Sequence, residues 1–149
     1  MKIFGHPVHA MLVHFPSALF PMEFLYYGIF YYFGNPTFAY AAFFSISTGV
    51  IFGWLALTSG LFDLMTIDRA NKKVLKTALL HALLNTIVLI CYTLLLVSEL
   101  QHYPHYKEAG LAILIIKGIL IFILAGGNFL GGKLVFNYNI GTKQQHTHE

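Results

Sequence analysis

The residues of this chain that can bind a cofactor are histidines and a few other polar side chains set in apolar sequence. The segment HPVHAMLVHFP at 6–16 holds three of the histidines within nine residues. Further along the chain, apolar residues flank Asp63, His81 and Asn85. Imidazole is the commonest metal ligand in proteins and a frequent axial ligand of heme iron. The pattern therefore indicates ligation of heme or of a metal ion.

The elements that must position these residues are four long apolar runs. Hydrophobic residues make up 57% of the 149-residue chain and charged residues only 10%, whereas soluble domains carry roughly 25% charged residues. Each run exceeds the ~18 residues that indicate a membrane span. We place the runs near 9–33, 40–65, 75–98 and 109–132.

These runs predict an all-α fold, an integral membrane four-helix bundle. Only helices and closed barrels can span lipid, and continuous apolar runs of this length exclude a barrel. We expect one membrane domain at 1–142 and a disordered tail at 143–149. The net charge of +3 gives no reason to expect a nucleic-acid partner, because the basic residues lie at membrane borders.

The basic residues outside the spans predict the orientation of the bundle. One side of the membrane carries seven of them, and the opposite side carries only Lys107. The seven are Lys2, Arg69, Lys72, Lys73, Lys76, Lys133 and Lys143. Because positively charged loops stay in the cytoplasm, both termini are expected to face it, giving an N-in, C-in topology.

His14 and His81 are the expected axial ligands of one heme b in the cytoplasmic leaflet. They lie at similar depth in the first and third spans, whose helices run parallel, and these two spans can be diagonal in a bundle of four sequential helices. Small residues at Gly53 and Gly60 are expected to leave space for the macrocycle. Each ligand imidazole needs a partner on its second ring nitrogen.

Other polar side chains of the same leaflet complete the expected heme site. Asp63 and Asn85 are candidate partners of the imidazoles, and Asn128 lies near the cytoplasmic end of the fourth span. Lys133 is a candidate partner for a heme propionate.

Two further interpretations of the same cluster are open. His6, His9 and Asp63, with His14 and His81, can supply ligands for Zn, Cu or non-heme Fe. Alternatively, the cluster has a purely structural role and stabilises the helix bundle of an accessory membrane subunit. Deeper in the opposite leaflet, Glu23 is expected to pair with Lys117 or to lie in a subunit contact, which keeps a homodimer open as well.

Four segments together resemble the domain-of-unknown-function family 2231, predicted bacterial four-helix membrane proteins. They are GHPVHAMLVHFP at 5–16, TSGLFDL at 58–64, HALLN at 81–85 and GGKLVFNYNIGT at 131–142. The resemblance implies a location in the bacterial cytoplasmic (inner) membrane and supports the site named above, but no settled activity. Some relatives are joined to Rieske iron–sulfur domains, which favours electron transfer. The family's end carries His and Gly where this chain has Tyr138 and Asn139.

The sequence thus predicts a b-type cytochrome-like membrane protein that transfers single electrons. An electron carrier or binding protein is expected rather than a stand-alone enzyme. A Rieske-type protein or a quinol is the expected redox partner, and the lipid bilayer is the surrounding medium.

Overall fold

The computed structural model describes residues 2–3 and 6–140, and the side chains of residues 8–140. Its helices are α1 (Val8–Leu12), α2 (His14–Phe33), α3 (Pro36–Met65), α4 (Lys72–Leu100) and α5 (Leu111–Phe136). Before them, β1 (Lys2–Ile3) pairs antiparallel with β2 (His6–Pro7). With α1 and α2 counted as one stretch, four helices are long and apolar enough to cross a membrane. The predicted all-α fold and its four spans are therefore confirmed, whereas the predicted tail at 143–149 lies outside the described residues.

The first span is interrupted at Val13, where α1 passes into α2. Val13 donates its backbone N–H to the carbonyl of His9 at 3.1 Å, so the chain keeps a helical path across the interruption. Pro16 has no N–H to give to the carbonyl of Leu12, and its ring crowds that carbonyl. The first span therefore contains a short break near its start.

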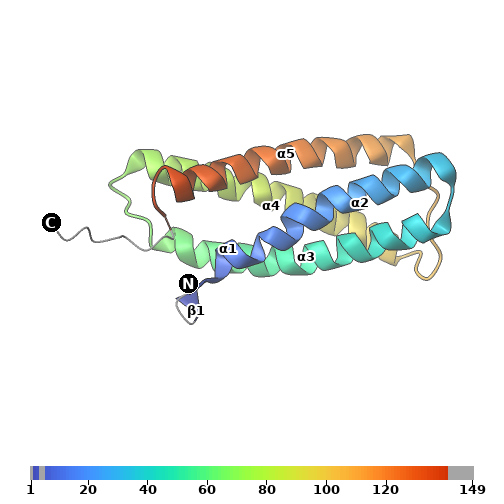
Figure 1. Cartoon of the computed structure of the whole chain (residues 1–149), viewed down its shortest axis with the longest axis horizontal. Coiled ribbons are helices and arrows are strands. Elements are labelled where there is room, and N and C mark those ends of the chain that lie inside the picture. Colours follow the sequence, from blue (N-terminus) through green and yellow to red (C-terminus); the bar gives the residue numbers. More distant parts are fainter. Residues whose placement is uncertain (1, 4–5, 141–149) are drawn as a thin grey trace.

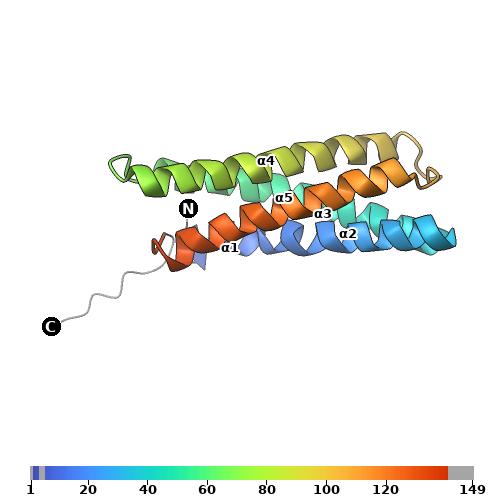
Figure 2. The same ribbon diagram turned by 90° about the horizontal axis from the view of Figure 1, so that it is seen from above.

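The four spans form two antiparallel hairpins, α2 with α3 and α4 with α5 (Figures 1 and 2). Contacts between α3 and α4 and between α2 and α5 close the ring of helices. As a result α2 and α4 are diagonal and parallel. We call the end with β1, β2 and residues 66–71 the strand end, and the end with residues 34–35 and 101–110 the loop end.

The loop end is organised by a tight turn between α2 and α3. Gly34 adopts a left-handed φ of 66° and caps α2 through its N–H to the carbonyl of Phe30. Asn35 accepts a hydrogen bond from the N–H of Thr37, and Pro36 begins α3. These are standard signals for ending one helix and starting another.

An apolar layer fills the middle of the bundle and separates the two ends. Phe20, Ile46 and Tyr92 are almost completely buried there, with Phe20 stacked on the ring of Tyr92 at 4.0 Å between centroids. Helix α3 turns its small residues inward, so that the ring of Phe20 covers Gly49 and the side chain of Leu89 covers Gly53. Large apolar side chains remain exposed on every helix, as expected for surfaces that face lipid.

Candidate functional site

His9 is held between α1 and α3 near the strand end. Its Nδ1 lies 2.9 Å from the carbonyl oxygen of Ala56. The ring rests on Gly60, where a Cβ atom would lie 2.8 Å from Cε1 of His9. Glycine at position 60 therefore makes room for the imidazole, and the carbonyl one turn earlier fixes its rotation.

His81 is held between α4 and α5 in the same way. Its Nδ1 lies 2.8 Å from the carbonyl oxygen of Gly127. A Cβ atom at Gly131 would lie 2.8 Å from Cε1 of His81. Each histidine thus rests on a neighbouring helix that offers a carbonyl at one position and a glycine four residues later. We call these two arrangements the histidine seats: Ala56 with Gly60, and Gly127 with Gly131.

The two imidazoles face each other between the hairpins. Their ring centroids are 6.3 Å apart and their planes meet at 83°. A carbonyl oxygen only accepts hydrogen bonds, so Nδ1 is the protonated nitrogen of each seated ring. In the neutral imidazole the lone pair then lies on Nε2, the atom that binds a metal when Nδ1 is held by a backbone carbonyl.

His14 is not the histidine that opposes His81. Its side chain is exposed on the outside of α2, whereas those of His9 and His81 are half-buried. Five residues of α-helix rotate the side-chain direction by about 140°, so His9 and His14 cannot both face the core. The expected opposition of His14 and His81 is therefore corrected to one of His9 and His81.

Depth along the bundle also differs from the expectation. Helix α4 and the end of α3 extend beyond the start of α1 at the strand end (Figure 1). His81, nine residues into α4, consequently lies level with His9, which is only the second residue of α1.

The space expected beside the small residues is filled by side chains. Leu89 covers Gly53, His9 covers Gly60, and Asn85 covers Gly127. The amide nitrogen of Asn85 lies 3.2 Å from Nδ1 of His81 and donates to the His81 carbonyl at 2.9 Å. Asn85 therefore lies directly beside one of the two imidazoles.

Other predicted site residues lie in the strand half of the bundle. Asn128 donates to the hydroxyl of Ser17 at 3.1 Å, which ties α5 to α2. Asp63 is half-buried on α3 one turn beyond Gly60, and Lys133 is half-buried on α5. His6 belongs to β2, but its side chain lies outside the described residues. Among the described residues, no three His, Cys, Asp or Glu side chains gather as a metal-ion site would require.

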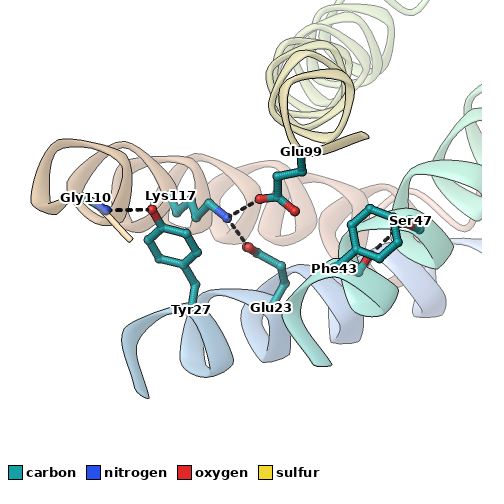
Figure 3. A network of polar contacts seen from close by, with 7 residues as sticks. All are labelled: Glu23, Tyr27, Phe43, Ser47, Glu99, Gly110 and Lys117. Carbon is teal, nitrogen blue, oxygen red and sulfur yellow. Dashed lines mark hydrogen bonds and ion pairs between the residues drawn. The ribbon is translucent and has the colours of Figure 1, made fainter. Parts of the chain in front are cut away.

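A second polar cluster lies toward the loop end, beyond the apolar layer (Figure 3). Lys117 of α5 is fully buried and forms an ion pair with the fully buried Glu23 of α2. The expected pairing of Glu23 with Lys117 is present. The Lys117 ammonium also lies 3.3 Å from a carboxylate oxygen of Glu99 on α4 and 3.9 Å from the ring centre of Tyr27. We call Glu23, Glu99 and Lys117 the charge triad.

Two features of these clusters were not predicted from the sequence: the histidine seats, and the contact of Glu99 with Lys117. The histidine seats have a sequence signal only in hindsight, because many glycines of the chain serve helix packing alone. Glu99 had a clearer signal, since it continues the face of α4 that carries His81, Asn85 and Tyr92 at steps of four and seven residues. That spacing predicts a side chain directed inward, where Lys117 meets it.

Comparison with known proteins supplies the family. No curated protein and no solved structure matches the chain. One family model, described as a predicted membrane protein (DUF2231), matches residues 5–144. The match spans all four membrane-crossing helices, both histidine seats and the charge triad. The chain is therefore a multi-pass membrane protein that belongs to the DUF2231 family.

Proposed function

We propose that this protein is a b-type cytochrome-like carrier of single electrons, with His9 and His81 as the axial ligands of one heme b. The observation that carries the proposal is the opposed pair of seated imidazoles. They come from diagonal parts of the bundle, and each has its Nδ1 fixed on a carbonyl and its Nε2 lone pair available.

The spacing of the rings suits two ligands on opposite sides of one metal atom. With metal–nitrogen bonds of about 2 Å, two such imidazoles place their ring centres about 6 Å apart. The measured separation is 6.3 Å. Perpendicular ring planes would be compatible with this coordination, because two imidazoles on opposite sides of one metal atom need not be coplanar.

A protein-bound metal ion is the weaker alternative. Structural and catalytic sites for Zn, Cu or non-heme Fe use three or four protein ligands, and the described residues do not gather three. A heme needs only two imidazoles, because its macrocycle fills the other iron positions. The number of ligands therefore favours heme b.

The chain's own residues hold and tune the site. Ala56 and Gly127 orient the imidazoles through their carbonyls, and Asn85 adds a polar contact beside His81. Lys133 on α5, two residues after Gly131, offers a positive charge for a propionate. A heme b held by these residues would supply one-electron chemistry, at a potential set by its ligands, burial and hydrogen bonds. A quinol or a Rieske-type protein is the proposed redox partner.

The proposal is tested on unmodified protein purified in detergent from cells supplied with a heme precursor. We expect an intense Soret band, sharp bands on reduction and one heme b per chain by the pyridine assay. Elemental analysis of the same sample serves as the control. Stoichiometric Zn or Cu without a Soret band would show that the site binds a metal ion and not heme. The absence of both heme and metal would show that the polar cluster is structural.

We also propose that the strand end faces the cytoplasm of a bacterial inner membrane. The motivation is the charge distribution: Arg69, Lys72, Lys73 and Lys76 lie within residues 66–76, whereas the loop end has only Lys107. Reporter fusions after Asn35 and after His105 are expected to read periplasmic, and a fusion after Lys73 cytoplasmic. The reverse pattern would place the histidine pair near the outer face.

A further inference from the structure

A cavity of about 180 Å³ opens at the loop end, on the far side of the apolar layer from the histidine pair. That volume is several times the roughly 30 Å³ share of one water molecule, so it has room for a small organic group. The loop at 101–110 covers it, held to α3 by a hydrogen bond from the hydroxyl of Tyr40 to the carbonyl of Pro104 at 3.2 Å. The aromatic residues that line it are Tyr27, Phe30, Tyr40, Phe43, Tyr103 and Tyr106.

The charge triad beside this cavity carries one more negative than positive group. Two carboxylates, those of Glu23 and Glu99, share the single ammonium of Lys117. One oxygen of Glu23 is fully buried and has no hydrogen-bond partner among the described residues, so it can accept a further hydrogen bond. At the rim, Lys107 and Glu108 offset each other. An unbalanced charge at a low-dielectric site is costly unless a cation or a bound proton neutralises it.

Glu99 brings this excess charge to the cavity. It borders the cavity and keeps 23% of its side-chain surface exposed, whereas Glu23 and Lys117 are completely covered. The neighbouring rings can stabilise a cation through their electron-rich faces. One such cation–π contact is present in the triad, where the Lys117 ammonium lies 3.9 Å from the centre of the Tyr27 ring (Figure 3).

We propose that the cavity beside Glu99 binds the ammonium group of a small organic cation. The carboxylate of Glu99 supplies the compensating charge, and the surrounding aromatic rings enclose the alkyl substituents. The cavity lies where α4 ends at Leu100 and α5 begins at Leu111, which is the boundary of the apolar spans. An ammonium can reach it from the aqueous phase or from a lipid headgroup. This site is independent of the heme proposal.

The test measures choline binding to the full chain by calorimetry, in nanodiscs of phosphatidylglycerol, a lipid without an ammonium group. The matched control ligand is 3,3-dimethyl-1-butanol, which has the shape of choline but no charge. We expect choline to bind in the millimolar range and the neutral ligand to bind at least about tenfold more weakly. Equal binding of the two ligands, or no binding of choline, would overturn the proposal without any variant.

Two substitutions locate the site. Glu99→Gln keeps the shape of the side chain and removes its charge, so choline affinity is expected to fall about tenfold. Glu99→Asp is expected to retain binding, and Asp68→Asn, in an exposed loop at the opposite end of the bundle, to change it less than about twofold. Choline affinity unchanged by Glu99→Gln would place the binding elsewhere and refute the assignment.

A change of lipid identifies the source of the ammonium. If lipid headgroups occupy the cavity, choline binding is expected to weaken in nanodiscs of phosphatidylcholine and to remain strong in those of phosphatidylglycerol. Equal choline binding in both lipids would assign the cavity to a soluble cation. Either result supports the ammonium site, whereas no choline binding in either lipid would refute it.

Discussion

The variant His81→Ala is expected to lose its heme or to hold it in a high-spin, ligand-accessible form. The reason is that low-spin iron requires both axial imidazoles, and the described side chains nearest to Gly127 and Gly131 are those of Asn85 and His81, of which only His81 carries an imidazole. His9→Ala is expected to have the same effect from the opposite side. Absorption spectra of the oxidised and reduced variants, normalised to protein, measure both outcomes.

His14→Ala is the matched control for this prediction. It removes an imidazole from the same span as His9, but one whose side chain is exposed on the outside of α2. Its heme content and low-spin spectrum are expected to equal those of the unmodified protein. Loss of the low-spin spectrum in His14→Ala, with an unchanged spectrum in His9→Ala, would restore His14 as the ligand and contradict the seat of His9 on Gly60.

Lys117→Met is expected to destabilise the bundle by about 3–5 kcal/mol, because removing one partner of a buried ion pair leaves the other charge uncompensated. Glu23 is completely buried, and its ion pair with Lys117 is its only hydrogen-bonded contact found in the described residues. Methionine fills a similar volume, so a cavity contributes little to the effect. Reversible unfolding in mixed micelles measures the change.

The double variant Lys117→Met/Glu23→Gln separates charge from packing. Removing the buried carboxylate together with the ammonium is expected to recover a large part of the lost stability, because the uncompensated charge is gone. If the double variant is as unstable as Lys117→Met, the effect comes from packing and the ion pair is not what stabilises this half of the bundle.

Much of the fold follows from sequence patterns that depend on local chemistry. The four helices coincide with the four apolar runs to within four residues at each end, because hydropathy alone decides which segments enter lipid. The turn at Gly34 and Asn35 follows from residues that end one helix and begin the next. The inward face of α3 follows from the three- and four-residue spacing of its small side chains.

That His9 and not His14 lies opposite His81 could not be predicted in the same way. It depends on the rotation of the first span, which the break at Val13 helps to set, and on how far α4 extends beyond the start of α1. Both depend on how the helices pack against one another, and neither can be predicted from the sequence of the first span alone. The prediction therefore had the rotation of the first span and the depth of its histidines wrong. The choice of histidine as residue type and of His81 is compatible with the structure.

The polar contacts between helices were predictable only in part. An acid and a base buried in different spans are expected to meet, and Glu23 and Lys117 do. The carbonyls of Ala56 and Gly127 that hold the imidazoles carry no side-chain signal, since every residue has a carbonyl. Their availability depends on glycine or alanine allowing a neighbouring ring to approach the backbone.

An experimental density map of the purified protein, at a resolution that shows side chains, tests the central claim most directly. We predict the density of a macrocycle between His9 and His81, with Nε2 of each ring directed at its centre and each Nδ1 still bonded to the carbonyl of Ala56 or Gly127. Two imidazoles in direct contact, with no density between them in protein prepared from heme-supplied cells, would contradict the claim and leave the pair as a packing contact between hairpins.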